Sequence, residues 1–491
     1  MAARLVVLGL DGADWSILRP LIESGALPNF RRISGSGTVA ALRSTLPALT
    51  PPAWTSMFTG VNPGKHGVFD FVKYSGGRTA LSGGNRMPYV WELLRSHKAI
   101  AFNVPCSYPP RPCPNAVVVS GFPSPGKGFC SPAGAEADIR RAVPDFEAWP
   151  AGLGKLLKGA DIKDRAALSA ALLRNMDMKA KAALHLMKGR DWELAVVVFS
   201  ATDWLQHFFM HEFMAAARKE GTEIAKAYAA ADRFLGEALA MGCDVMVVSD
   251  HGFAPARRKL YLNSLLRGRG LLRERPHLLG RRAASLLSPL APAMPLLKKV
   301  GKAVNAGIML LPGADVCERI DLKGSAAFLF SNDGGVALED AARAEEVRQA
   351  ILCAKDWEGR PMVREVYRRE DIYFGPETGK APALLVIPED DVLLSTTLAS
   401  GISSPIKPGK EKDGTHRKSG VFIAWGDGFR AQGEIQERSV MDVAPTILSY
   451  FSTDVPGYMD GTAIWPGRRI PGKKLLGAST RAALRRMAGS R

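Results

Sequence analysis

The sequence has few cysteines and no metal-finger pattern. Only six cysteines occur in 491 residues, and no two of them form a CxxC pair. A disulfide-stabilised secreted domain would need a denser set, so we expect reduced thiols and a cytoplasmic location. The chain also lacks the Cys/His spacing of zinc fingers and a basic stripe interleaved with aromatic residues. These absences argue against a nucleic-acid-binding module.

Long hydrophobic runs are also missing. The first apolar run, Leu5–Leu10, ends at Asp11 and is too short for the core of a signal peptide. The longest uncharged, leucine-rich stretch spans residues 283–297 and is interrupted by three prolines. It falls short of the roughly 18 to 20 apolar residues that a spanning helix needs. We therefore expect no transmembrane segment, and peripheral membrane contact at most.

Acidic residues are fewer than basic ones, and they are absent from two stretches. The formal net charge is +17. From Arg275 to Lys302 there are six cations and no acid, and the tail after Gly461 contains no Asp or Glu. A strongly basic chain favours anionic partners such as phosphate esters, nucleotides, acidic lipid surfaces or nucleic acid, and charge alone does not choose among them.

Short runs rich in Val, Ile, Leu and Phe alternate with helical patterns along most of the chain. The runs typical of strands buried on both faces are Leu5–Leu10, Ala99–Asn103, Val117–Ser120, Leu194–Ser200, Val245–Ser249, Leu384–Ile387 and Val421–Ala424. The helical patterns cover Asp14–Ser24, Arg165–Lys188, Glu223–Met241 and Val440–Phe451. This alternation predicts an α/β fold, a three-layer α/β/α sandwich with a largely parallel central sheet.

Residues 256–380 differ in character from the rest of the chain. They are basic, rich in Leu, Pro and Gly, and weak in strand patterns. We interpret this region as an insertion that forms a cap over the sheet. The α/β core would then comprise residues 1–255 and 381–491.

Acids and histidines occur near the ends of four predicted strands. They are Asp11, Asp203, His207, Asp250, His251 and His416. Ligands of open α/β sheets bind at the carboxyl ends of strands, so we expect these side chains to lie together. Carboxylates combined with imidazoles suit zinc, manganese or iron, whereas calcium and magnesium prefer oxygen ligands. One such residue alone is more often a helix cap or turn residue. Their joint placement indicates a metal site.

The spacing within this set adds detail. Asp203 and His207 are four residues apart, so on a helix both would face the same way and hold one metal. Asp250 and His251 are adjacent, so on an extended chain they would point to opposite sides. That arrangement fits a pair serving two neighbouring sites, or one ligand beside a structural residue.

Thr50 is the candidate nucleophile. With Pro51 directly after it, Thr50 is expected to be the N-cap of a helix. A helix N-terminus favours a phosphate, and coordination to a metal would lower the pKa of the hydroxyl. A plain capping threonine is the competing interpretation.

A longer pattern surrounds Thr50. It consists of Pro47, Thr50, Pro52, Ser56, Thr59, Gly60, Pro63, His66 and Gly67. This pattern resembles the nucleophile segment of type I phosphodiesterases and nucleotide pyrophosphatases, members of the alkaline phosphatase superfamily. The acids and histidines follow in the family's order. The segments around His416, Asp442 and Asp460 are similar to the bacterial and archaeal branch described as predicted phosphohydrolase/phosphomutase. The resemblance spans nearly the whole chain outside residues 256–380, and implies an alkaline-phosphatase-like core.

The resemblance implies two divalent metal ions, with zinc as the first choice and manganese or iron as alternatives. One ion would be held by Asp203, His207 and His416. The other would be held by Asp11, Asp250 and His251, with Thr50 Oγ between the two. Such a pair, about 3.5 to 4 Å apart, stabilises the attacking and leaving oxygens of an in-line displacement. Thr50 would form a covalent phospho-intermediate, which water then hydrolyses.

One position departs from the family pattern. Nucleotide pyrophosphatases of this type carry Asn three residues after the nucleophile, where it binds a phosphate oxygen, whereas this chain has Ala53. We expect that oxygen to be bound by backbone N–H groups at the helix start, or by Arg417 or Lys65. The departure weakens the case for nucleotide substrates. We interpret Asp14, His66 and His211, which lie near these motifs, as structural.

Three functions fit these observations. The first is hydrolysis of a phosphate ester, a diester rather than a monoester, on a small molecule or a lipid headgroup. The second is a phosphomutase that returns the phosphate from Thr50 to the substrate beneath a cap that excludes water. The third is a non-catalytic, metal-stabilised protein at an anionic membrane surface, bound through the basic insertion and tail. Sulfate esters and phosphonates are alternative substrates.

Overall fold

The computed structural model describes residues 4–75, 78–81, 84–150, 153–158, 161–275, 316–465 and 469–470. Most of the acid-free stretch 275–302 and nearly all of the basic tail lie outside these ranges. The alternative in which both segments contact an anionic membrane is therefore untested. Among the described residues, no helix combines the length and hydropathy needed to cross a bilayer.

A sheet of ten strands forms the centre of the molecule, in the order β22-β2-β21-β11-β1-β10-β5-β6-β7, with β23 also paired to β2. The strands are β1 (Leu5–Leu10), β2 (Thr38–Arg43), β5 (Ala99–Val104), β6 (Ala116–Ser120), β7 (Cys130–Ser131), β10 (Leu194–Phe199), β11 (Asp244–Val248), β21 (Ser419–Trp425), β22 (Gly433–Glu434) and β23 (Arg438–Ser439). In this sheet β21 and β7 run against the others. The predicted largely parallel sheet is confirmed.

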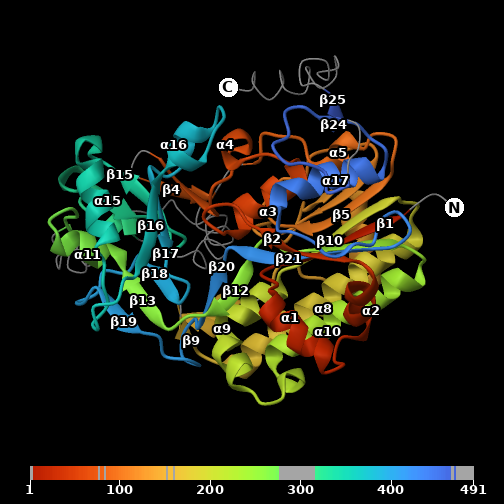
Figure 1. The fold of residues 1–491 in the computed structure, drawn as a ribbon, viewed down its shortest axis with the longest axis horizontal. Helices are drawn as coiled ribbons and strands as arrows, with labels where there is room; N and C mark the ends of the chain where they lie inside the picture. Colours follow the sequence, from red (N-terminus) through yellow and green to blue (C-terminus); the bar gives the residue numbers. More distant parts are fainter. Residues whose placement is uncertain are drawn as a thin grey trace, which may run out of the picture.

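Helices cover both faces of this sheet, as Figure 1 shows. One face carries α1 (Trp15–Glu23), α2 (Pro28–Ser36), α6 (Gly134–Ala142), α7 (Leu153–Leu156), α8 (Arg165–Gly189), α9 (Ala201–Ala215) and α10 (Glu223–Ala240), and the other carries α3 (Thr50–Thr59), α5 (Val90–Leu93) and α17 (Val443–Tyr450). Alternate residues of β1 point to opposite faces, so Val6 and Leu8 join one core while Leu5 and Val7 join the other. Burial on both faces explains why this strand is a continuous apolar run. The α/β/α architecture is confirmed.

A second lobe packs beside the core and has its own hydrophobic core. It contains the four-stranded sheet β14-β15-β17-β16 and the three-stranded sheet β18-β13-β19. Its elements are β13 (Arg258–Tyr261), α11 (Leu262–Gly268), α14 (Val316–Arg319), β14 (Ala327–Leu329), β15 (Gly335–Leu338), α15 (Ala344–Leu352), β16 (Val363–Arg368), α16 (Arg369–Ile372), β17 (Leu384–Pro388), β18 (Val392–Ser395) and β19 (Ser403–Pro405).

The strand β17 corrects one sequence-based prediction. The run Leu384–Ile387 was expected in the central sheet, but β17 pairs antiparallel with β15 and β16 in the lobe. A short apolar run predicts a buried strand without specifying which sheet receives it. The lobe therefore extends past residue 380, through β19.

A two-stranded ribbon lies between the core and the lobe in Figure 1. It pairs β12 (Gly252–Pro255) with β20 (Gly414–Arg417), placing Phe253 opposite His416. This ribbon brings His416 to the segment that follows β11. Other short α-helices and strands are α4 (Pro63–His66), β3 (Val72–Ser75), β4 (Arg78–Leu81), β8 (Leu157–Lys158), β9 (Asp161–Ile162), β24 (Val455–Pro456) and β25 (Arg469–Ile470).

His66 at the end of α4 is fully buried beneath α3. Its Nδ1 accepts the N–H of Val68 at 3.1 Å, so Nε2 carries the proton and donates to Ser56 Oγ at 2.9 Å. The bond that Nδ1 accepts needs the neutral imidazole, and burial lowers the pKa of His66 to about 3. These contacts fit the structural role expected from the sequence.

This buried histidine predicts a pH dependence of stability. Between the folded and unfolded pKa values the unfolded chain binds the extra proton, so the contribution of His66 is complete above pH 6.5 and is lost as the pH falls. From pH 7.5 to 5.5 the loss should be about 1.4 kcal/mol. Urea unfolding of wild type and His66→Gln at both values measures it. Equal pH dependence in both proteins would contradict the assignment.

Candidate metal centre and nucleophile

The predicted site residues gather at the carboxyl ends of three adjacent strands. Asp11 follows β1, Asp203 lies in the first turn of α9 directly after β10, and Asp250 and His251 follow β11. Because β1 lies between β10 and β11 in the sheet, these side chains meet at one edge. The ribbon β12-β20 adds His416 to the same place.

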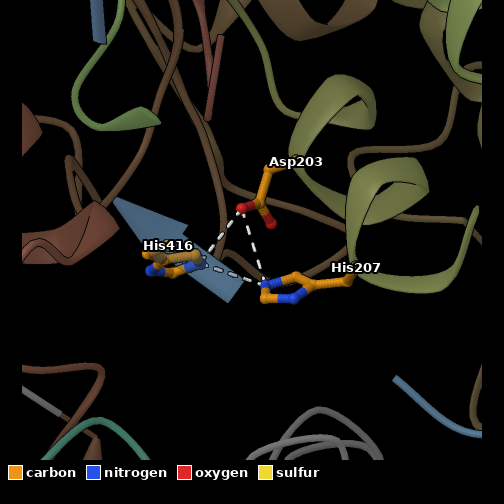
Figure 2. A group of neighbouring side chains, drawn as sticks. All are labelled: Asp203, His207 and His416. Carbon is orange, nitrogen blue, oxygen red and sulfur yellow. Dashed lines mark hydrogen bonds and ion pairs between the residues drawn. The ribbon is translucent and has the colours of Figure 1, made fainter. Parts of the chain in front are cut away.

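Asp203, His207 and His416 form the first cluster, shown in Figure 2. Asp203 and His207 come from successive turns of α9, so the predicted common face of a helix is observed. Asp203 Oδ1 lies 3.6 Å from His207 Nε2 and 3.3 Å from His416 Nε2, and the two Nε2 atoms are 3.1 Å apart. Three donor atoms thus converge within one coordination shell.

Asp11, Asp203 and His251 form a second cluster, which shares Asp203 with the first. His251 Nε2 lies 3.6 Å from Asp11 Oδ1 and 4.0 Å from Asp203 Oδ1. Asp250 stands beside this group, with its Oδ2 3.1 Å from His251 Nε2. Thr50 Oγ1 is 3.3 Å from His251 Nε2 and 3.4 Å from Asp11 Oδ1. The candidate nucleophile therefore borders the second cluster.

The outer nitrogens of the three histidines are held by backbone carbonyls. His207 Nδ1 contacts Gly414 O at 3.1 Å, His251 Nδ1 contacts Gly252 O at 3.1 Å, and His416 Nδ1 contacts Ala48 O at 3.0 Å. A carbonyl oxygen only accepts, so each Nδ1 carries a proton, and in the neutral ring each Nε2 presents a lone pair. This outer bonding is typical of histidines that ligate metals.

The convergence of these lone pairs calls for a positive charge. Two unprotonated Nε2 atoms 3.1 Å apart repel unless a cation lies between them. Asp203 Oδ1 and Asp250 Oδ2 are buried and lack a hydrogen-bond partner among the described residues. Unpaired buried carboxylate oxygens are costly, and a metal ion would supply the missing partner. The donor set therefore fits divalent metal ions.

The protonation behaviour of the cluster gives the same indication. Burial, followed by the charges of Asp250 and Asp203, raises the pKa of Asp11 well above its usual value. Burial also raises the pKa of Asp250 to about 7 and lowers that of His251 to about 3. Burial opposes the charged form of His416, but Asp203 raises its pKa overall. The clustered carboxylates thus favour a nearby cation, whether a proton or a metal ion.

Thr50 lies one position further into its helix than expected. Leu49, in extended conformation, is the N-cap, and Thr50 is the first residue of α3. The next two residues, Pro51 and Pro52, have no N–H, and the N–H of Ala53 already donates to Leu49 O at 3.0 Å. The helix start therefore offers few N–H groups to a phosphate, contrary to the expectation from the sequence.

The family model for type I phosphodiesterase / nucleotide pyrophosphatase matches residues 5–420, which include every candidate ligand and Thr50. The chain belongs to this family. It is accordingly a metal-dependent phosphoric ester hydrolase of the alkaline phosphatase superfamily. No curated protein matches this phosphodiesterase-family member.

Solved structures share the fold of this family member at low sequence identity. Phosphonoacetate hydrolase from Sinorhizobium meliloti 1021, in complex with phosphonoacetate, is 15% identical with a TM-score of 0.57, covering 90% of this chain and 94% of its own. Murine ectonucleotide pyrophosphatase/phosphodiesterase 5 is 12% identical with a TM-score of 0.50, covering 95% and 97%. Both likenesses support the alkaline-phosphatase-like fold.

Lys65 and Arg417, the two cations proposed from the sequence to bind substrate, do not lie in positions that suit this role. The Lys65 ammonium pairs with Asp460 and donates to Tyr458 O at 2.9 Å. Arg417 is exposed and follows His416 on β20, so its side chain points to the opposite side of the strand. Neither position favours contact with an anion at the metal centre.

The residues interpreted as structural have local partners. The Asp14 carboxylate caps α1 by accepting from Ser16 N and also accepts from Phe253 N. His211 Nε2 lies 2.6 Å from Ala256 O. Sequence reasoning missed Lys412 and Asp333, whose charges act on the candidate ligands His207 and His416. The position of Lys412 four residues before His416 was the available signal.

Proposed function

We propose that the protein hydrolyses phosphodiesters through a covalent phospho-Thr50 intermediate, with two zinc ions held by the paired clusters. The observation that carries this proposal is the position of Thr50 Oγ1 within 3.4 Å of both Asp11 and His251. Bound divalent ions would supply charge stabilisation and lower the pKa of the hydroxyl. The zinc assignment rests on the mixed carboxylate and imidazole donors.

The protein's own groups perform the positioning in this mechanism. Leu49 and the proline-rich start of α3 present the Thr50 hydroxyl to the clusters from a rigid helix. The bonds from three carbonyls fix the imidazoles, so no reorganisation is needed when charge develops on the phosphoryl group. The phosphorus–oxygen bond to the leaving alcohol breaks as the bond to Thr50 Oγ1 forms. Water then cleaves phospho-Thr50 and releases the phosphoryl product.

The preference for diesters over monoesters is a prediction from family membership. Metal-loaded protein should turn over bis-p-nitrophenyl phosphate faster than p-nitrophenyl phosphate, by about tenfold or more. Parallel assays with a sulfate ester and with phosphonoacetate test the alternative substrates, the latter because a structural relative is a phosphonoacetate hydrolase. Equal or faster turnover of the monoester would contradict the diesterase proposal.

The phosphomutase alternative is separated by its products. A mutase returns the phosphoryl group to the substrate, so neither free alcohol nor inorganic phosphate accumulates. Continuous release of p-nitrophenol over many catalytic cycles would exclude a mutase whose site is closed to water. The lobe that follows residue 255 is the feature that favours the phosphomutase alternative, because a mutase needs a cap that excludes water from the site.

A further inference from the structure

Lys412 lies on the segment between β19 and β20, and this segment is fixed against the helix that carries the first cluster. The N–H of Asp413 donates to His207 O at 2.7 Å, and the Asp413 carboxylate accepts from Met210 N at 2.9 Å. The backbone beside Lys412 is therefore held by α9. These bonds fix the backbone next to Lys412 relative to Asp203 and His207 on the same helix.

The side chain of Lys412 is half-buried against aromatic rings of the same helix. Its Nζ lies 5.8 Å from the ring centroid of Trp204 and 5.9 Å from that of Phe208. Within the described part of the chain, no carboxylate comes within ion-pair distance of this ammonium. The nearby Lys259, in contrast, is paired with Glu411. Lys412 is thus a held cation without an anionic partner.

The ammonium of Lys412 lies beside the first cluster. Trp204 and Phe208, whose rings it contacts, directly follow Asp203 and His207 on α9. Burial lowers the pKa of Lys412 itself, while the charges of Asp203 and Asp333 oppose that change. A partly desolvated ammonium is unfavourable until an anion approaches it. Three carboxylates also leave two divalent ions incompletely neutralised, so the loaded site has room for added negative charge.

Several of the groups expected to bind a phosphate oxygen are not available at the site. Ala53 has no polar side chain, Pro51 and Pro52 have no N–H, and Lys65 is paired with Asp460. We propose that Lys412 Nζ binds a nonbridging oxygen of the substrate's phosphoryl group and takes the place of the missing amide. This inference rests on the proposed function and adds to it a residue that positions the substrate.

The test compares Lys412→Met with Lys410→Met. Lys410 is exposed on the same segment, so its replacement removes the same charge without touching the site. Binding of inorganic phosphate to metal-loaded protein is measured by calorimetry, and KM and kcat are measured with bis-p-nitrophenyl phosphate. We expect Lys412→Met to weaken phosphate binding by about tenfold or more and to raise KM, with metal content unchanged. Lys410→Met should match wild type, and Lys412→Arg should recover part of the affinity.

The outcomes separate this inference from the proposed function. Equal phosphate affinity in Lys412→Met and Lys410→Met, with both metals bound, would overturn the role of Lys412. Loss of metal from Lys412→Met would also overturn it, because the residue would then act on the ligands. Wild type that binds metal and phosphate without turnover would contradict the proposed hydrolysis, while the calorimetric comparison would still decide the role of Lys412.

Discussion

Thr50→Ala should lose about three orders of magnitude or more in turnover of bis-p-nitrophenyl phosphate and keep its bound metal. The hydroxyl lies 3.3 Å from His251 Nε2 and 3.4 Å from Asp11 Oδ1, where it is the one nucleophile that the family pattern supplies. The substitution should not disturb the helix, because Leu49 is the N-cap of α3 and no side-chain capping bond is present. The lost activity would then report chemistry rather than folding.

Two measurements make this result decisive. Thr50→Ser keeps a hydroxyl at the same position and should remain within about tenfold of wild type, since only a methyl group is removed. Metal content and thermal unfolding of the three proteins should agree. A Thr50→Ala variant that retained most of its turnover while loaded with metal would rule out phospho-Thr50 and leave direct attack by water on the substrate.

The catalytic end of the fold could be predicted because its signals are local. Strand β1 is apolar on both faces and is followed directly by Asp11, and the four-residue spacing of Asp203 and His207 places both on one face of α9. A buried strand followed at once by a charged residue needs only short-range reasoning. The order of these segments along the chain then supplied the family resemblance.

Other features of the fold and the site depend on contacts between residues far apart in sequence, which cannot be predicted from local patterns in a single sequence. The run at β17 joins the lobe because its hydrogen-bonding partners are β15 and β16. Strand β2 has only one buried face along its length, so it lacks the apolar run that marks its neighbours. The approach of Lys412 to His207 depends on the Asp413 contacts that fix the segment before β20. Lys65 was proposed from its closeness to the Thr50 segment in sequence, but Asp460 engages it.

The shared position of Asp203 leads to the second large effect. The resemblance implied that Asp203 serves one ion and that Asp11, Asp250 and His251 serve the other. In the structure Asp203 Oδ1 also belongs to the cluster with Asp11 and His251, at 4.0 Å from His251 Nε2. A change at Asp203 should therefore disturb both ions, whereas a change at His207 should disturb mainly the first.

We expect Asp203→Asn to lower the occupancy of both metal ions and to reduce turnover by about a hundredfold or more, because a neutral amide replaces the charged ligand that both clusters share. His207→Ala should lose close to one equivalent and keep the other. Metal analysis after dialysis against a defined free-zinc buffer measures both. Two retained equivalents in Asp203→Asn would show that Asp203 is not a ligand.

Stability provides an independent readout of the same assignment. When the free metal concentration is about a thousand times the dissociation constant, binding stabilises the folded state by about 4 kcal/mol per site. Chelation of the metal should therefore lower the unfolding temperature of wild type. Chelation should lower the unfolding temperature of Asp203→Asn least, and that of His207→Ala by an intermediate amount. Without metal, Asp203→Asn also removes one of the buried charges that raise the pKa of Asp11 and Asp250. If the shift on chelation were the same in all three proteins, the ions would lie elsewhere.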